Sequence, residues 1–299
     1  MAVSKKELAK FKGIISALIT PFDSNGRIAR PVLKKLLEFQ VKAGINGFFI
    51  SGTAGLGPVM PIAQRKVLTE LVHSNIGKKS VIIDQVGSPD TATSVELARH
   101  AEKIGVDAIA LMAPYYYAHD TTSLYGHFVR VAKSVSIPVF LYNIPRNAQV
   151  NLTADFIKTV NSSAPNVIGV KDSSRNYEHL LTLIEQLEDF VIINGTDSYL
   201  FPALVMGCHA AVTGYSNAFP ELYVKLYKNF KESKYNAAKK NQSKINDVRT
   251  LLSTPQITAI YEAVKMRGID VGKPRPPFRA ATLQEKASIR RGLKDIGLV

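Results

Sequence analysis

The sequence has almost no cysteine. Cys208 is the only one among 299 residues, which excludes an intramolecular disulfide and a zinc site built from cysteines. Such sparing use of cysteine is typical of a reducing compartment. The chain also lacks the run of about 20 apolar residues that a membrane helix needs. No apolar core follows the charged residues near the N-terminus, as a secretory signal would require. We therefore expect a cytoplasmic protein with no membrane partner.

Acidic residues are scarce beside basic ones. The chain carries 38 Lys and Arg residues against 24 Asp and Glu residues, which gives a formal net charge of +14. Such an excess of positive charge attracts nucleic acids, acidic surfaces or anionic metabolites. The lysines concentrate at 225–244, where their spacing predicts the solvated face of a helix. Because no RNA- or DNA-binding motif is present, we do not expect nucleic acid as a partner.

No linker rich in proline, glycine or serine divides the chain, although its length would allow either two domains or one barrel. Short apolar runs instead alternate with stretches of helical periodicity, which indicates parallel strands joined by helices. The eight runs are 13–20, 47–51, 80–86, 107–112, 138–142, 167–171, 190–194 and 210–213. We predict an α/β fold, a closed (β/α)8 TIM barrel. The alternative is a doubly wound sheet with a second domain.

The pattern changes to helices alone near residue 219. Helical periodicity is found at 31–44 and 91–105 between the predicted strands, and at 253–268 and 282–297 after the last of them. Three prolines within 273–278 forbid a helix there. We expect residues 10–220 to form the barrel core and residues 221–299 to form the final barrel helix with an appended C-terminal helical region.

One lysine, Lys171, directly ends a strand-like apolar run. The site of a TIM barrel lies at the C-terminal ends of its strands, and an ammonium group at the end of a buried strand is unfavourable unless something uses it. A lysine attacks a ketone only when neutral, so its pKa must fall from about 10.4 to near 7, at a cost of about 4 kcal/mol. Apolar surroundings supply part of that free energy by desolvating the ammonium group. The alternatives are a lysine that extends into solvent or one that pairs with Asp172.

Side-chain alternation along this strand places Lys171 on the same face as Gly169 and places Asp172 on the other. Gly169 would leave space beside the stem of the lysine. The other predicted strand ends carry phenols and hydroxyls, few carboxylates and no histidine. This set suits a Schiff-base lysine with a phenolic proton carrier better than metal-dependent hydrolysis.

A tyrosine and a glycine-rich loop follow two other strand-like runs. Tyr142 is the candidate proton carrier, and its alternative role is that of a core tyrosine with a satisfied hydroxyl. The backbone amides of the loop 52–57 and the Thr53 hydroxyl could hold a carboxylate. The loop matches neither the dinucleotide-binding motif nor the phosphate-binding loop. The sequence therefore predicts a carboxylate site rather than a nucleotide site.

The ordered set GTAG, PYYY, YNIP, GVKD and NGTD lies within residues 52–197. On this set the chain resembles, over roughly residues 13–220, the dihydrodipicolinate synthase / N-acetylneuraminate lyase family of pyruvate-dependent class I aldolases. The resemblance implies that Lys171 forms an imine with pyruvate and that Tyr142 moves protons at the reacting centre. It implies that Thr53 links the tyrosines and helps to hold the pyruvate carboxylate, and that Tyr116 reaches across a dimer interface to complete the proton relay. Family members are commonly homotetramers, arranged as dimers of dimers, and the imine chemistry needs no metal or other cofactor.

The carboxylate-binding loop departs from the family pattern. Ala54 replaces a second hydroxyl residue, so the backbone amides of Ala54 and Gly55 would serve in its place. Leu56 replaces the glutamate that the synthases usually carry, and residues 52–58 look more like archaeal 2-keto-3-deoxygluconate aldolases. Arg146 lies one residue before the position of the arginine that binds the carboxylate of the aldehyde in the synthases.

Further positions match those that bind the sugar portion of a substrate in the sugar-acid aldolases. Gly195, Asp197 and Ser173 match positions that bind hydroxyls, and Gly214 lies near the tail of such a substrate. The sequence predicts a Schiff-base lyase that forms or breaks a C–C bond between pyruvate and a small aldehyde, with a 2-keto-3-deoxy sugar acid as the expected substrate.

Three alternatives to this function stay open. A dihydrodipicolinate synthase would condense pyruvate with aspartate semialdehyde, and a keto-deoxy acid dehydratase would use the same imine. A non-catalytic barrel that binds polyanions through its basic C-terminal helices is the alternative from a different functional class.

Overall fold

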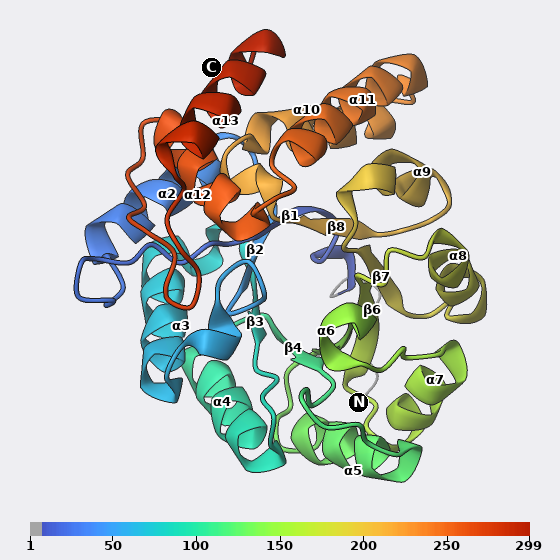
Figure 1. Ribbon diagram of the computed structural model, residues 1–299. Helices are drawn as coiled ribbons and strands as arrows, with labels where there is room; N and C mark the ends of the chain where they lie inside the picture. Colours follow the sequence, from blue (N-terminus) through green and yellow to red (C-terminus); the bar gives the residue numbers. More distant parts are fainter. Residues whose placement is uncertain (1–7) are drawn as a thin grey trace.

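Eight parallel strands form a closed barrel in the computed structural model, which describes residues 8–299. Each strand pairs with its neighbours in sequence, and β1 pairs with β8, so Figure 1 shows a ring of strands inside a ring of helices. The strands are β1 (Gly13–Ala17), β2 (Gly47–Ile50), β3 (Val81–Gln85), β4 (Ala108–Met112), β5 (Val139–Asn143), β6 (Val167–Asp172), β7 (Val191–Asn194) and β8 (Ala210–Thr213). The eight predicted strands and the TIM barrel are confirmed. Residues 1–7, which hold most of the segment judged not to be a secretory signal, lie outside the described residues.

Helices cover the outside of the barrel and continue beyond it. The barrel helices are α2 (Arg30–Lys42), α3 (Ile62–Ile76), α4 (Thr91–Ile104), α5 (Thr121–Ala132), α6 (Pro145–Ala148), α7 (Ala154–Ser163), α8 (Tyr177–Gln186), α9 (Leu200–Val205) and α10 (Pro220–Lys231). Local sequence explains their ends: the Asp90 carboxylate accepts a hydrogen bond from the Thr93 amide at the start of α4, and Gly105, with φ +90°, ends it. The predicted helices at 31–44 and 91–105 are therefore confirmed as α2 and α4.

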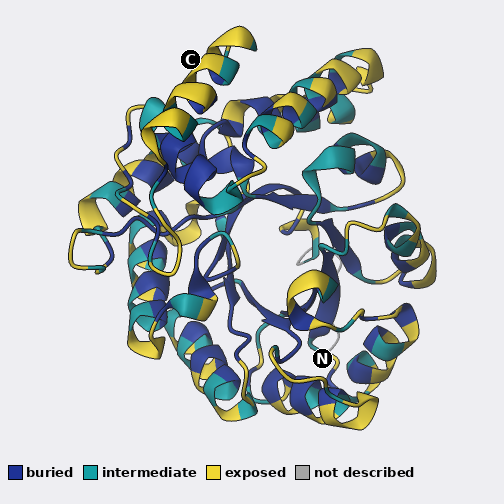
Figure 2. Cartoon of the chain, in the orientation of Figure 1, coloured by how far each residue is buried: buried dark blue, intermediate teal, exposed yellow. Residues whose placement is uncertain are grey.

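The strands are buried on both faces, as expected for a parallel sheet covered by helices. Every residue of β4, β5 and β6 is buried. Figure 2 accordingly shows dark blue strands and places the exposed residues on the outer faces of the helices and in the loops. A polar side chain at the end of such a strand is therefore taken out of water unless it faces a cavity.

The C-terminal region contains α11 (Tyr235–Leu251), α12 (Gln256–Met266) and α13 (Leu283–Asp295), and 273–278 is a loop as predicted. The lysines of the segment 225–244 lie at exposed or half-buried positions, as predicted, but the segment is not one helix. The segment covers the end of α10 and the start of α11, which are separated at residues 232–234, where Ser233 adopts φ +56°. The division of the chain at residue 220 stays a prediction. None of the helices in residues 8–299 has both the length and the apolar character required to cross a lipid bilayer.

Candidate active site

The C-terminal ends of the strands surround a cavity of about 160 Å³ that contains Lys171. Its lining includes all of the predicted site residues except Gly55 and Tyr116. The predicted residues that line it are Thr53, Ala54, Tyr142, Arg146, Lys171, Ser173, Gly195, Asp197 and Gly214. The fold thus brings together residues from five separate strand ends, and their catalytic and binding roles stay predictions.

Lys171 is a buried amine enclosed by aromatic rings. Its side chain is part of a residue only 4% exposed, and its Nζ lies 3.7 Å from the ring centroid of Phe49 and 3.8 Å from that of Tyr142. Within residues 8–299, no hydrogen bond or salt bridge engages this Nζ. Burial lowers the pKa of Lys171 well below its usual value, and the charge of Asp197 opposes that shift. The amine is therefore held toward its neutral, nucleophilic form, and the solvent-extended alternative is excluded.

Asp172 lies on the opposite face of β6 from the cavity. Its Oδ1 accepts a hydrogen bond of 2.7 Å from Asn143 Nδ2, and its Oδ2 accepts one of 2.8 Å from Ser174 Oγ. Burial raises the pKa of this carboxyl group. These contacts exclude the alternative in which Asp172 pairs with Lys171, and they confirm that Asp172 does not line the cavity.

The sequence suggested that Gly169 leaves space beside the stem of Lys171, but the atoms nearest to that space belong to Val191 and Phe140. A Cβ atom there would lie 2.4 Å from the Val191 carbonyl oxygen and 2.7 Å from the ring of Phe140. Those distances are too short for real contacts, so Gly169 permits the close approach of β7 and of an aromatic ring. The prediction misjudged which neighbour occupies the space.

Tyr142 lies opposite Lys171 in the register of β5 and β6. Its ring contacts Phe49 edge to face with centroids 5.4 Å apart, and its hydroxyl lies 3.5 Å from Thr53 Oγ1. Burial raises the pKa of Tyr142, while hydrogen bonding to Thr53 and Ser173 acts in the opposite direction. A phenol in this setting stays protonated unless a nearby positive charge stabilises its phenolate form or a leaving group accepts its proton.

The glycine-rich loop is fixed by packing against the barrel wall. A Cβ at Gly55 would lie 2.8 Å from the Leu18 carbonyl oxygen, and the Gly55 carbonyl accepts a hydrogen bond of 2.7 Å from Thr20 Oγ1. Leu56 adopts φ +62° and is 2% exposed, so its side chain belongs to the core. Gly55 and Leu56 therefore shape the loop, while Thr53 and Ala54 line the cavity.

Asp197 is held by one residue of β8 and by two residues of the helices that follow it, α10 and α11. Its Oδ1 accepts hydrogen bonds from Thr213 Oγ1 at 2.5 Å and from the Tyr223 hydroxyl of α10 at 2.7 Å. Its carbonyl oxygen accepts a third, of 2.8 Å, from Gln242 Nε2 of α11. Burial raises the pKa of this carboxyl group. Helices α10 and α11 thus help to fix the carboxyl group whose charge acts on Lys171.

Two glycines give the cavity its shape. A Cβ at Gly195 would lie 2.0 Å from Ser173 Oγ, so only glycine leaves room for this hydroxyl. At Gly214 a Cβ would lie 3.5 Å from Ile260 Cδ1 and 3.9 Å from the Cβ of Ala54. Gly214 therefore leaves open space where α12 covers the cavity, and a methyl group there would meet ordinary contacts.

Tyr116 is not part of this cavity within one chain. It is 78% exposed, its ring contacts that of Tyr117 edge to face, and its backbone adopts φ +89°. Bulky residues rarely adopt this backbone conformation. The exposed aromatic pair therefore points away from the barrel on the β4–α5 loop.

Sequence reasoning missed several residues that build the site. These are Phe49, which contacts the lysine amine, Tyr223 and Gln242, which hold Asp197, and Arg175 and Gln256, which line the cavity. Phe49 carried a usable signal, since it lies near the end of a strand. The signals for Tyr223 and Gln242 were absent, because both lie on helices that follow the eight strands and approach Asp197 only through the tertiary fold.

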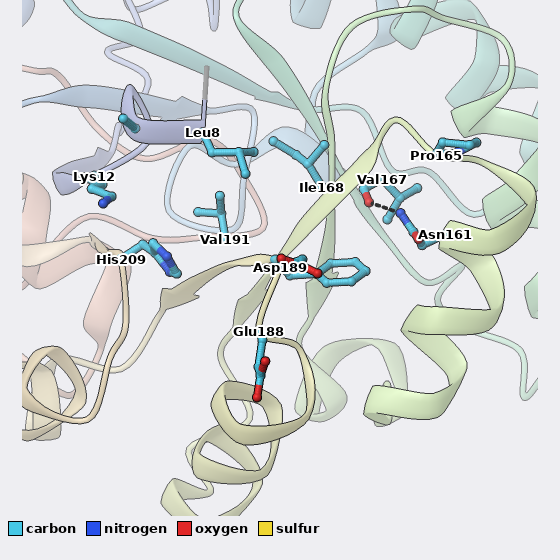
Figure 3. A pocket seen from close by; sticks show the side chains of 12 residues that line it. Leu8, Lys12, Asn161, Pro165, Val167, Ile168, Glu188, Asp189, Val191 and His209 are labelled. Carbon is cyan, nitrogen blue, oxygen red and sulfur yellow. Dashed lines mark hydrogen bonds between the residues drawn. The ribbon is translucent and has the colours of Figure 1, made fainter. Parts of the chain in front are cut away.

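A second, larger cavity of about 510 Å³ lies at the opposite end of the barrel. Figure 3 shows Lys12 and His209 on one side of it and Glu188 on another. It is formed by the segments that enter the strands, so it is remote from Lys171.

Comparisons with known proteins agree with this geometry. The sequence matches the dihydrodipicolinate synthetase family over residues 10–296. It is 32% identical to a 4-hydroxy-tetrahydrodipicolinate synthase of Bartonella bacilliformis, over 96% of this chain and 99% of that protein. It is 30% identical to an uncharacterized DapA-like lyase of Halobacterium salinarum, over 96% of this chain and 94% of that protein.

A solved structure shows the same fold over nearly the whole chain. It is that of YagE, a prophage protein of the dihydrodipicolinic acid synthase family from E. coli K12 in complex with pyruvate. The TM-score is 0.93 at 27% identity, with 97% of this chain and 99% of that chain covered. The chain therefore belongs to the dihydrodipicolinate synthetase family of pyruvate-dependent class I aldolases, and it is a lyase.

Proposed function

We propose that Lys171 forms the imine with pyruvate and that the enzyme cleaves or forms 2-keto-3-deoxy sugar acids. The observation that carries this proposal is the buried Lys171 amine, which lies within a cavity at the strand ends and has a pKa lowered by burial. A neutral amine is the nucleophile that adds to a ketone, and the resulting iminium accepts the electrons of the breaking bond. Among residues 8–299, Lys171 is the one lysine that lines this cavity.

In the proposed reaction Tyr142 acts twice. The neutral Nζ adds to the C2 carbonyl of the keto acid to form a carbinolamine. Tyr142, which its raised pKa keeps protonated, donates its proton to the departing hydroxyl, so that water leaves and an iminium and a phenolate remain. The nearby iminium charge stabilises the phenolate.

The phenolate of Tyr142 then takes the proton from the C4 hydroxyl. The C3–C4 bond breaks, an aldehyde leaves, and the electron pair enters the iminium to give an enamine. Protonation at C3 and hydrolysis release pyruvate and restore the neutral amine of Lys171. The reverse sequence forms the bond.

The lining of the cavity supports a hydroxylated substrate. Thr53 Oγ1 and the backbone of Ala54 lie where they can hold the carboxylate of the keto acid, while Ser173 and Asp197 offer polar groups to hydroxyls farther along the chain. A hydroxyl that donates to Asp197 would use the Oδ2 oxygen, because Oδ1 already accepts two hydrogen bonds.

A substrate panel tests this proposal. The enzyme is expected to release pyruvate and an aldehyde from 2-keto-3-deoxygluconate, with kcat/KM at least about tenfold above that for condensing pyruvate with aspartate semialdehyde. Formation of a dehydrated keto acid without aldehyde would identify a dehydratase. A preference for aspartate semialdehyde would overturn the sugar-acid assignment while leaving the imine chemistry in place.

Dihydrodipicolinate synthase activity is the second candidate. Two observations favour it: relatives such as the Bartonella bacilliformis protein carry that name, and Arg146 lines the cavity, where it could meet a carboxylate. Against it, Leu56 packs in the core at the position where the synthases usually carry glutamate. The same substrate panel separates the two candidates.

We also propose a cytoplasmic homotetramer in which Tyr116 enters the site of the neighbouring subunit. The exposed Tyr116–Tyr117 pair supports this arrangement, because its aromatic surface has no cover within the described chain. Sedimentation should give a tetramer mass. A fully active monomer at assay concentration would contradict the shared site.

A further inference from the structure

A hydrogen-bonded pair of polar side chains lies directly behind the two proposed catalytic residues. In the register of β5 and β6, Tyr142 is opposite Lys171, and the next two residues, Asn143 and Asp172, are opposite each other. Because side chains alternate along a strand, the first pair faces the cavity and the second faces the surrounding helices. Asn143 Nδ2 donates a hydrogen bond of 2.7 Å to Asp172 Oδ1, and both residues are fully buried. Side chains therefore link the two strands one residue beyond the reacting groups.

Packing alone does not require polar residues at these two positions. The preceding residues that face the helices, Leu141 and Val170, are apolar and fully buried. A buried amide and a buried carboxylate both lose their hydration, which is unfavourable unless each is hydrogen-bonded. Once satisfied, such a pair admits a narrower range of distances and angles than apolar contacts do. The Asn143–Asp172 pair thus fixes one geometry for the two strand ends.

The side chain of Asn143 also ties β5 to the segments outside it. Its Nδ2 donates a hydrogen bond of 2.9 Å to Asn151 Oδ1 and lies 3.2 Å from His179 Nε2 of α8, while its Oδ1 accepts one of 2.9 Å from the Leu152 amide. Figure 1 shows α7 and α8 on the outer side of β6. These contacts hold Asn143 in one orientation, and with it the strand end that carries Tyr142.

The end of β6 is fixed in the same way. Asp172 Oδ2 accepts a hydrogen bond of 2.8 Å from Ser174 Oγ, which itself accepts one of 3.1 Å from a backbone amide two residues on. Arg175, within this turn, adopts φ +62°, a conformation that is disfavoured for a residue other than glycine and must be held by its surroundings. Ser173, which lines the cavity, donates its amide to the Asn143 carbonyl at 2.8 Å.

We propose that Asn143 and Asp172 are positioning residues, which hold Tyr142 and Lys171 at the separation that proton transfer requires. This inference rests on the proposed function, in which Lys171 forms the imine and Tyr142 moves the protons. Neither residue of the pair lines the cavity, so neither contacts the substrate. Their effect is geometric, because a misplacement of about 1 Å between reacting groups lowers a rate by about 100-fold.

Exchange of the donor and the acceptor tests the pair. Asn143→Asp places two carboxyl groups against each other and breaks the hydrogen bond. A double variant that combines Asn143→Asp with Asp172→Asn again supplies one amide and one carboxylate, in reversed order. Asn229→Asp is the matched control, because Asn229 Nδ2 donates a hydrogen bond of the same length, 2.7 Å, to Asn241 Oδ1 between α10 and α11.

The assay follows pyruvate alone, so it does not depend on the identity of the aldehyde. Each protein is incubated with pyruvate in heavy water, and NMR measures the exchange of the methyl protons. In the proposed mechanism the iminium loses a C3 proton to a base and becomes an enamine, which then takes a deuteron at C3. Borohydride trapping on the same samples measures the imine on Lys171. Calorimetry gives each melting temperature, and the assays are run well below it.

Asn143→Asp is expected to exchange saturating pyruvate about 10- to 100-fold more slowly than the native enzyme, with KM for pyruvate changed by less than about threefold. The adduct on Lys171 should still form. The double variant should return the rate to within about fivefold of the native value, and Asn229→Asp should stay within about twofold of it. A role in stability alone would lower the melting temperature and leave the exchange rate of the folded protein unchanged.

A native exchange rate in folded Asn143→Asp, or an equal loss in Asn229→Asp, would overturn the proposal. The double variant decides the case in which Asn143→Asp does not fold: native-like exchange supports the pair, whereas a double variant that is slow or unfolded contradicts it. A native enzyme that gives neither adduct nor exchange removes the imine mechanism itself. A native enzyme that gives both, with unchanged variants, removes only the positioning pair.

Discussion

The two ends of the barrel differ in size and in chemistry. The cavity at the N-terminal ends of the strands has a volume of about 510 Å³, and the one at the C-terminal ends about 160 Å³. The larger cavity is lined by Lys12, His209 and Glu188, which are residue types that often act in catalysis. The smaller one contains a buried lysine whose pKa is strongly lowered, beside a tyrosine whose pKa is raised. The candidate active site is therefore identified by neighbouring groups with shifted pKa values, and not by the volume of the cavity.

The polar groups at the N-terminal end serve the fold. His209 Nδ1 accepts a hydrogen bond of 3.2 Å from the Ile192 amide, and Asn161 Nδ2 donates one of 2.8 Å to the Val167 carbonyl, drawn as a dashed line in Figure 3. Burial lowers the pKa of His209 and keeps the ring neutral. These contacts tie the starts of β6 and β7 to neighbouring segments.

The largest expected effect distinguishes two lysines that lie at opposite ends of the barrel. Lys171→Met should lower kcat by about 10⁴-fold or more, because it removes the nucleophile. Lys12→Met, the matched control in the larger cavity, should leave kcat/KM within about twofold of the native value, since a surface charge remote from the reacting atoms contributes little. Steady-state assays with one substrate measure both. A severe loss in Lys12→Met would break the comparison.

Tyr142→Phe is expected to lower kcat by about 10²- to 10⁴-fold, the range for loss of a general acid–base group. Imine trapping with pyruvate should persist in this variant, because Lys171 remains. Tyr125→Phe is the control: its hydroxyl bonds Ser163 Oγ at 2.6 Å between α5 and α7, away from the cavity. Unchanged turnover in Tyr142→Phe would remove the tyrosine from its proposed role.

Tyr223→Phe tests whether α10 contributes to the site. Loss of its hydrogen bond to Asp197 should raise KM for a hydroxylated substrate about tenfold, with a smaller change in kcat, because a hydrogen bond to a charged group contributes about 1.5–3 kcal/mol. Tyr227→Phe, on the same helix, controls for the substitution. Equal KM values in the two variants would show that Tyr223 does not position Asp197 for binding.

The smallest effect concerns stability. Burial lowers the folded-state pKa of Lys171 below its unfolded value, so between those two pKa values the unfolded chain binds more protons and stability falls as pH falls. Lys171→Met should therefore raise the melting temperature at pH 7, and by less near pH 10. For a chain of this size each kcal/mol gives a shift of about 2–4 °C. Calorimetry at both pH values measures it, with Lys12→Met as the unshifted control.

The sequence predicted the barrel and its principal residues for physical reasons. Eight apolar runs separated by helical periods specify β/α units, and a lysine at the end of a buried run is conspicuous because such a charge is unfavourable. Asp172 could be placed off the reacting face by side-chain alternation alone. These features depend on neighbours in sequence.

Features that depend on distant segments could not be predicted. Tyr223 reaches Asp197 from α10, the helix that follows the last strand, and Phe140 fills the space at Gly169 from the neighbouring strand. The backbone conformation of Arg175 depends on hydrogen bonds within its loop. No local pattern specifies these contacts, since they arise only after the strands have closed into a barrel.

Borohydride reduction in the presence of pyruvate, followed by mass spectrometry of the peptides, tests the central claim most directly. The account predicts a stable three-carbon adduct on Lys171 and none on Lys12, because burial lowers the pKa of Lys171 and so favours its neutral, nucleophilic form. A folded protein that gains no adduct, or that carries it on another lysine, would contradict the assignment of Lys171 as the imine-forming residue.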